Sequence, residues 1–162
     1  MEFNYCPCCG GRITHKEFDT LIRHYCEQCE RIHYRNPIVG VAIIIMQAGK
    51  ILLARRNNSY AGKWCIPCGY VEWDEDVRNA AIREFAEETG LEATIDRVFN
   101  VHSNFHDKGS QTVGIWFLGQ MVGGEIKAGS DVDEVAWFDL DDPPEMAFPT
   151  DCLILNELKD SL

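Results

Sequence analysis

The alternation of apolar and polar residues predicts a domain with a mixed sheet in the larger part of the chain. The longest apolar run, Ile38–Met46, predicts a buried strand, and Gln47-Ala48-Gly49 predicts a turn into a partner strand at Lys50–Arg55. Further strand-like stretches are Thr94–Val101, Thr112–Met121 and Glu134–Phe138, and the pair Gly123-Gly124 is typical of a turn.

Two segments have helical periodicity. Apolar residues recur every four positions in Asp76–Thr89, with Asp74 as the expected N-cap and Gly90 as the left-handed residue that commonly ends a helix. The segment Asp151–Lys159 predicts a closing helix with three inward leucines, Leu153, Leu155 and Leu158. A mixed sheet with a central and a C-terminal helix indicates an α/β or α+β fold.

The first 34 residues differ in composition from the rest of the chain. They hold five of the eight cysteines and have no long periodic segment. The pair Asn36-Pro37 marks a break, because the residue before a proline is pushed away from helix. We therefore expect two domains, residues 1–35 and residues 36–162.

The cysteines of the first domain have the spacing C-x2-C-x16-C-x2-C, which is typical of a structural zinc site. The predicted ligands are Cys6, Cys9, Cys26 and Cys29. Cys8 does not fit the C-x2-C spacing of this set. The alternative to a zinc site is a disulfide pair or a redox couple. So small a segment buries little surface, so we expect Zn²⁺ binding in this zinc ribbon to supply its folding energy.

Composition limits the partners that the chain can bind. Its 26 acidic and 15 basic side chains give a net charge of −11, which repels polyanions and disfavours DNA or long RNA. The longest apolar run is far shorter than the roughly 20 residues of a membrane helix. Residues 1–20 lack the basic and then apolar order of a signal peptide. We expect no membrane span and a cytoplasmic protein.

The most informative segment is an acidic helix face. Glu84, Glu87 and Glu88 share one face at positions i, i+3 and i+4, where like charges repel. A hard divalent cation such as Mg²⁺ or Mn²⁺ relieves that repulsion and prefers oxygen ligands. From charge alone, a solvated acidic surface explains the pattern equally well.

The helix belongs to a longer motif that separates these two interpretations. Residues 69–91 match G-x5-E-x7-R-E-U-x-E-E-x-G-U, where U is a bulky apolar residue, at every fixed position. The chain therefore resembles the Nudix hydrolases, and the similarity spans about residues 37–160. The resemblance implies an α/β fold of the α/β/α sandwich type, in this chain with a small N-terminal zinc ribbon.

The resemblance also implies a metal site. In it Glu84, Glu87 and Glu88 bind Mg²⁺ or Mn²⁺, and the backbone carbonyl of Gly69 joins them. These cations neutralise a diphosphate and activate a water molecule that attacks phosphorus.

Three further roles follow from the same resemblance. Arg83 orients the glutamates through charged hydrogen bonds. Glu75 supports the helix or serves as an outer ligand. For the general base, Glu87 and Glu84 are the candidates, with Glu134 behind them.

The implied reaction is hydrolysis of the pyrophosphate bond in a nucleoside diphosphate linked to another group, with release of mononucleotide products. A zinc ribbon before a Nudix core is similar to the NADH pyrophosphatase group, but residues 92–125 lack the S-Q-P-W-P-F-P-type motif of the NADH-cleaving members. The arrangement is nearer to ADP-ribose and FAD pyrophosphatases, so we expect a small substrate of the ADP-ribose, FAD or dinucleotide type. The resemblance alone implies a homodimer.

Two other functions stay open. One is a sanitising hydrolase of damaged nucleoside triphosphates, which shares the chemistry. The other is a non-catalytic regulator that senses nucleotides or binds nucleic acid, against which the intact acidic set argues.

The sequence leaves several candidate residues without a role. Neither the pair Cys65-x-x-Cys68 nor His102 and His106 can be assigned from their spacing. Trp73 is the tryptophan most available for stacking on a base.

Overall fold

A computed structural model describes residues 4–129 and 131–161 of the chain. The chain divides into two compact units, Met1–Pro37 and Ile38–Leu162. The first unit is an antiparallel sheet of β1 (Ile13–Phe18), β2 (Leu21–Cys26) and β3 (Arg31–His33), in the order β1-β2-β3. Its apolar core consists of Cys6, Ile13 and Cys26, with Cys29 packed against them. So small a core buries little apolar surface to stabilise the unit.

The second unit is built on one mixed sheet. Five strands follow in the order β10-β5-β4-β9-β8, while β6 pairs with β5 and β7 pairs with β4. The strands are β4 (Ile38–Gln47), β5 (Lys50–Arg56), β6 (Trp64–Cys65), β7 (Cys68–Tyr70), β8 (Leu91–Asn104), β9 (Thr112–Gly124) and β10 (Val132–Asp139). Among the paired strands that the structure describes, β4 and β9 run parallel, and the other pairs are antiparallel.

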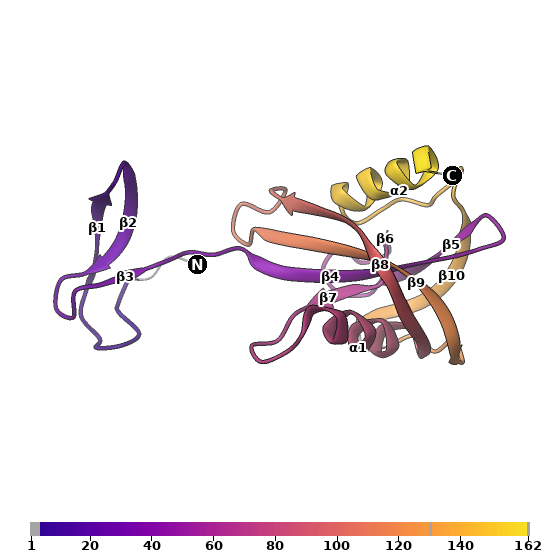
Figure 1. The fold of residues 1–162 in the computed structure, drawn as a ribbon, viewed down its shortest axis with the longest axis horizontal. Coiled ribbons are helices and arrows are strands. Elements are labelled where there is room, and N and C mark those ends of the chain that lie inside the picture. The colour runs from indigo at the N-terminus through magenta and orange to yellow at the C-terminus, as the bar shows by residue number, and fades with distance from the viewer. Residues whose placement is uncertain (1–3, 130, 162) are drawn as a thin grey trace. The chain divides into compact units, whose positions relative to one another are not determined.

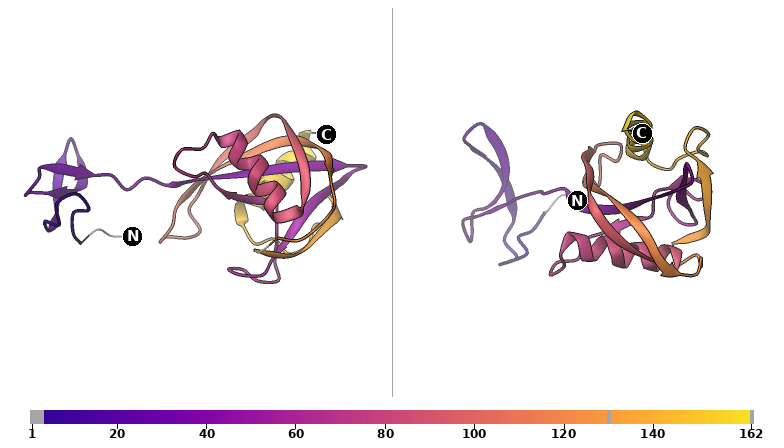
Figure 2. Two further views of the ribbon diagram at one scale, coloured as in Figure 1. Left: turned by 90° about the horizontal axis from the view of Figure 1, so that it is seen from below. Right: turned by 45° about the vertical axis from the view of Figure 1, so that its right-hand side comes forward.

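Two helices cover opposite faces of this sheet, α1 (Val77–Thr89) on one side and α2 (Pro149–Ser161) on the other (Figures 1 and 2). The central strand β4 serves both layers, because successive side chains of a strand point to opposite faces. Val41, Ile43 and Ile45 pack in the core under α1. Ala42 and Ile44 pack in the core under α2. This double burial explains the continuous apolar run and confirms the α/β/α sandwich.

Helix α1 begins two residues later than its predicted cap implies. Its N-cap is Asp76, whose carboxylate accepts a hydrogen bond from the backbone N–H of Arg78 at 2.9 Å, so the assignment of the cap to Asp74 was wrong. At the other end Gly90 has φ = 73° and donates its N–H to Ala86 O, as predicted. The loop before α1 is thus longer, and it brings Glu75 back toward the helix.

Two further details differ from the prediction. Gly123 and Gly124 end β9 opposite Glu92 and Leu91 rather than forming a turn, and a Cβ at Gly124 would overlap the carbonyl oxygen of Gly90. In α2 the inward residues are Ile154, Leu155 and Leu158, while Leu153 is 49% exposed. Residues two apart on a helix lie about 200° apart, so Leu153 and Leu155 could not share a face.

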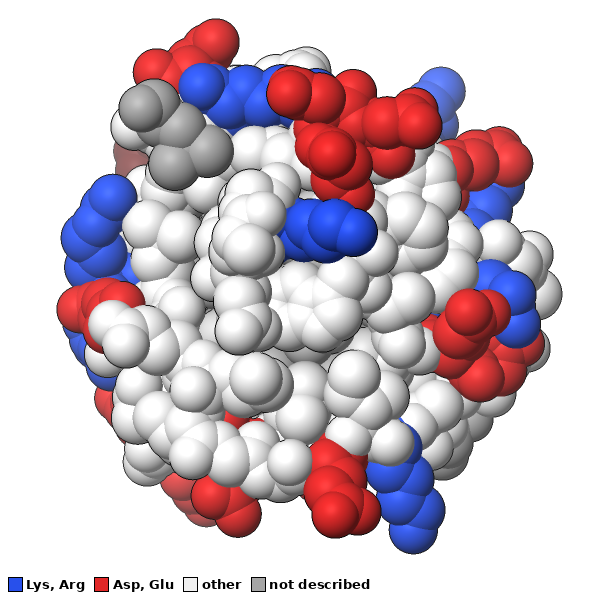
Figure 3. Space-filling model, turned by 90° about the vertical axis from the view of Figure 1, so that its right-hand side faces the viewer, with Lys and Arg blue, Asp and Glu red and all other residues white. Residues whose placement is uncertain are grey.

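No helix among the described residues is long and apolar enough to cross a membrane. Figure 3 looks onto one end of the molecule, where the centre is uncharged and basic side chains lie beside acidic ones around it. That face offers no broad basic patch to a polyanion.

Candidate active site

A glycine of β7 lies in close contact with a glutamate side chain of α1. Gly69 lies in β7, which pairs with β4 through Val41. A Cβ at Gly69 would overlap the carboxylate of Glu84. Glycine is therefore required here for close approach, so that the Glu84 side chain lies directly on the strand backbone.

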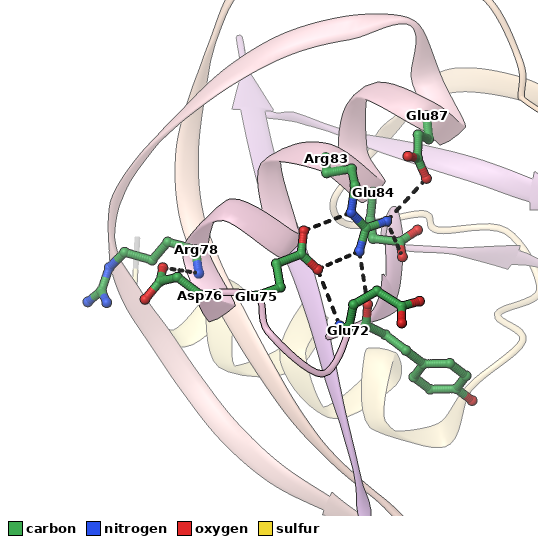
Figure 4. Close-up of polar contacts among 8 residues, drawn as sticks. Glu72, Glu75, Asp76, Arg78, Arg83, Glu84 and Glu87 are labelled. Carbon is green, nitrogen blue, oxygen red and sulfur yellow. Dashed lines mark hydrogen bonds and ion pairs between the residues drawn. The ribbon is translucent and has the colours of Figure 1, made fainter.

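Arg83 is the centre of the polar contacts around this loop (Figure 4). Its Nε and Nη2 donate to the two oxygens of Glu75 at 2.8 Å each, and Nη2 also donates to Tyr70 O at 3.2 Å. Its Nη1 donates to Glu84 Oε1 at 2.8 Å and to Glu87 Oε2 at 3.2 Å. One guanidinium thus joins three carboxylates, and its bidentate hydrogen bonds hold the pKa of Glu75 below its usual value.

Glu88 is the buried member of the acidic set. Its side chain lies against β7, where Oε2 accepts the backbone N–H of Cys68 at 2.9 Å, and the residue is 6% exposed. Burial raises the pKa of Glu88 to about 7, although the hydrogen bond from Cys68 and the charge of Arg56 act in the opposite direction. A cation close to this carboxylate is expected to stabilise its charged form.

A cavity of about 380 Å³ opens beside these residues. Its carboxylate-bearing lining residues are Glu72, Glu84, Glu88, Asp107, Asp131 and Asp151. Arg56 is the one lysine or arginine among the described lining residues. The cavity is therefore strongly acidic, and an anion needs added cations to enter it.

The structure brings part of the predicted site together at this cavity. Glu84, Glu88 and Gly69 line it, whereas Glu87 lies outside its lining and is bound to Arg83. Among the described residues only the four cysteines form a compact group of possible metal ligands, so the three glutamates are not gathered into one such group in this structure. Glu134 lies away from the cavity lining and forms an ion pair with Arg55 at 2.7 Å.

Sequence reasoning missed Asp151, which is the most deeply buried acid at the cavity. Its two oxygens accept the backbone N–H of Ile66 at 3.1 Å and the indole N–H of Trp116 at 3.2 Å. Burial raises the pKa of Asp151 to about 7, and these two hydrogen bonds act in the opposite direction. The carboxylate thereby ties α2 to β9 and to the segment after β6. In sequence its only signal was an acidic residue in the first turn of a helix.

The unassigned cysteines and histidines fall into different places. His106 and Cys68 line the cavity. His102 instead contacts Glu157 of α2 at 3.0 Å. The contact with Cys65 and burial raise the pKa of the Cys68 thiol, so it is not activated as a thiolate.

In the first unit the four predicted cysteines form one cluster. The sulfur atoms of Cys6, Cys9, Cys26 and Cys29 all lie within 4.8 Å of one another. Two of the Sγ–Sγ distances are 3.6 Å (Cys6 to Cys29) and 3.5 Å (Cys9 to Cys26). Thiolates about 2.3 Å from one Zn²⁺ in a tetrahedron lie about 3.8 Å apart, so the group fits zinc. All four are free cysteines, and Cys8 lies outside the cluster.

Comparison with known proteins agrees with this geometry. The ADP-ribose pyrophosphatase of Methanocaldococcus jannaschii is 38% identical over 128 residues, which cover 78% of this chain and 76% of that protein. The NAD-capped RNA hydrolase NudC of Vibrio atlanticus is 28% identical over 156 residues, which cover 91% of this chain but 53% of that protein. The chain thus spans about half the length of the NudC relatives.

Solved structures give the same result. The crystal structure of a NUDIX hydrolase from Nitrosomonas europaea is 31% identical and superposes with a TM-score of 0.84, covering 97% of this chain and 89% of that one. The NUDIX domain family matches residues 35–155, which include the whole motif from Gly69 to Leu91. The chain therefore belongs to the Nudix family and is a Nudix pyrophosphohydrolase.

Proposed function

We propose that this enzyme uses Mg²⁺ or Mn²⁺ to hydrolyse the pyrophosphate bond of a nucleoside diphosphate linked to another group. The observation that carries the proposal is the charge of the cavity, which six acidic side chains and one arginine line. A diphosphate is repelled from such a cavity unless cations accompany it. Carboxylate oxygens are also the ligands that Mg²⁺ prefers.

The described residues suit such cations. Glu84 and Glu88 present hard oxygen donors to the cavity. Because Gly69 has no side chain, its backbone lies directly beside Glu84. In our proposal Glu84, Glu87 and Glu88 hold the ions together with the Gly69 carbonyl. When bound, the ions neutralise the diphosphate and activate a water molecule. Arg83 and Glu75 keep the glutamates in position.

We further propose a substrate of the ADP-ribose, FAD or dinucleotide type. The support is similarity, since a relative named ADP-ribose pyrophosphatase is 38% identical over 78% of this chain. Relatives named NAD-capped RNA hydrolase match 91% of the chain, so a nucleotide-capped RNA belongs among the compounds to test.

In the cysteine cluster we propose a structural Zn²⁺. Four thiolates fill a tetrahedral site and leave no position for a reacting water, so the ion would stabilise the first unit rather than take part in catalysis.

The test is a product-resolved assay of the full chain with Mg²⁺ or Mn²⁺. The panel contains ADP-ribose, FAD, NADH, a dinucleoside polyphosphate, NAD-capped RNA and oxidised dGTP. We expect release of mononucleotide from a compound of the ADP-ribose, FAD or dinucleotide type. Glu88→Gln should lower kcat by about 10²-fold or more, because a carboxylate of the cation site is lost.

The control is Glu92→Gln, which changes an exposed glutamate of β8 outside the cavity lining and should leave kcat unchanged. Wild-type kcat in Glu88→Gln, or turnover without divalent cations, would refute the proposal. Preferential cleavage of oxidised dGTP would assign the enzyme to the sanitising class instead.

A further inference from the structure

Three aromatic rings form another part of the cavity wall. Tyr60, His106 and Phe148 all line the cavity and contact one another. The ring centroids lie 5.5 Å apart for Tyr60 and Phe148, 5.9 Å for His106 and Phe148, and 6.2 Å for Tyr60 and His106. We call these three residues the aromatic group. None of them belongs to the motif that defines the metal site.

The aromatic group is assembled from three separate loops. Tyr60 follows β5, His106 lies between β8 and β9, and Phe148 precedes α2. Tyr60 has φ = 62°, a left-handed conformation that bulky residues rarely adopt. Hydrogen bonds hold the loop in this form, among them Lys63 N–H to Tyr60 O at 3.1 Å.

Polar contacts fix the other two rings. His106 Nδ1 lies 2.7 Å from Asn104 Oδ1, which also accepts the hydroxyl of Thr150 at 3.2 Å. The guanidinium carbon of Arg56 lies 5.2 Å from the centre of the Phe148 ring.

Arg56 connects the aromatic group to the carboxylates. Its side chain donates to Ser59 O and to Asn58 Oδ1, both at 2.9 Å, and its charge also acts on Glu88. The one lysine or arginine among the described lining residues therefore lies against the Phe148 ring and is close enough to Glu88 to act on its charge. A ligand with its phosphates near the carboxylates can place an adjoining planar group on the rings within the same cavity.

We propose that the aromatic group binds the heteroaromatic base of the nucleotide by stacking. The proposal rests on the proposed function for the class of ligand, but it concerns binding and requires no turnover. Every nucleobase has a π face, and aromatic stacking tolerates different bases. Trp73, the tryptophan favoured from sequence for this role, is 95% exposed and lies outside the cavity lining.

The test compares the equilibrium binding of AMP with that of ribose 5-phosphate, which has the same sugar phosphate without a base. The protein is the full chain in Mg²⁺, and binding is followed by calorimetry or by NMR. We expect wild type to bind AMP more tightly. Phe148→Leu and Tyr60→Leu should each weaken AMP binding by about 5- to 150-fold, the range for loss of one base–aromatic stack. Neither should change the affinity for ribose 5-phosphate.

The matched control is Trp73→Leu, which removes an exposed aromatic side chain outside the cavity and should change neither affinity. Unchanged ribose 5-phosphate binding also shows that the leucine variants keep the rest of the site folded. Equal affinities of wild type for AMP and ribose 5-phosphate, or full AMP affinity in both leucine variants, would overturn the proposal. Failure of the proposed hydrolysis would leave these binding results intact, so the two proposals fail separately.

Discussion

At the scale of single residues, two buried carboxylates stand out because burial disfavours their charged form. Glu88 and Asp151 are 6% and 2% exposed, and burial raises the pKa of each to about 7. Each native carboxyl group therefore keeps its proton at pH values where the unfolded chain has already lost it. Between about pH 4 and pH 7 the native state binds more protons, so the free energy of unfolding falls as pH rises.

Asp151 allows this effect to be measured, since it lies outside the proposed metal site. A full shift from 3.8 to about 7 corresponds to about 4 kcal/mol. In Asp151→Asn the fall in unfolding free energy between pH 4 and pH 7 should be shallower than in wild type. Urea titrations followed by tryptophan fluorescence report it, because all four tryptophans lie in the second unit. Asp160→Asn, an exposed change on the same helix, should keep the wild-type slope.

Residues of the site differ in how far the sequence predicted them. The fixed spacing of one motif placed Arg83 and Glu84 correctly in a helix, because they are close in sequence, and Gly69 lies in β7 before that helix. The contact between Arg56 and Phe148 was not predictable, because Arg56 ends β5 and Phe148 precedes α2, and only the folded chain brings these distant segments together. Local spacing carries no information about such distant neighbours.

At the scale of elements, the start of α1 decides how the acidic loop is arranged. Two aspartates compete for the N-cap in sequence, and preference by residue type does not separate Asp74 from Asp76. In the structure Asp76 is the cap, and this choice leaves Glu75 outside the helix, where it accepts both hydrogen bonds from Arg83. The predicted strands were mostly correct in place but too short, because pairing between β8 and β9 extends both.

Paired substitutions test this cap. Asp76→Ala should lower the free energy of unfolding by about 1 kcal/mol, the usual cost of losing a capping side chain. Asp74→Ala should change it by less than about 0.5 kcal/mol, as an exposed substitution without such a contact. Thermal unfolding of both variants measures this difference. An equal loss of unfolding free energy in the two variants would contradict the assignment of Asp76 as the cap.

At the scale of the whole molecule, the two units differ in what stabilises them. The second unit has two extensive apolar cores, whereas the first packs few apolar residues around four thiols. A strong zinc chelator should therefore unfold the first unit and leave the second folded.

NMR of the full chain measures this difference directly. Amide signals of β1 to β3 should collapse to random-coil positions on chelation, while tryptophan fluorescence, which reports the second unit, stays unchanged. Adding Zn²⁺ back should restore the signals. Persistence of native signals from the first unit after complete removal of zinc would show that this unit stays folded without a bound ion.

The parallel pairing of β4 with β9 also has a consequence for synthesis on the ribosome. Ile38 pairs with Thr112, so the most apolar strand leaves the ribosome long before its parallel neighbour has been made. Meanwhile β4 can pair only with β5 and then with β7, and its other edge stays open. During translation this edge is an unpaired edge of an apolar strand and thus open to aggregation, and a chaperone that shields it has to act before residue 112 emerges.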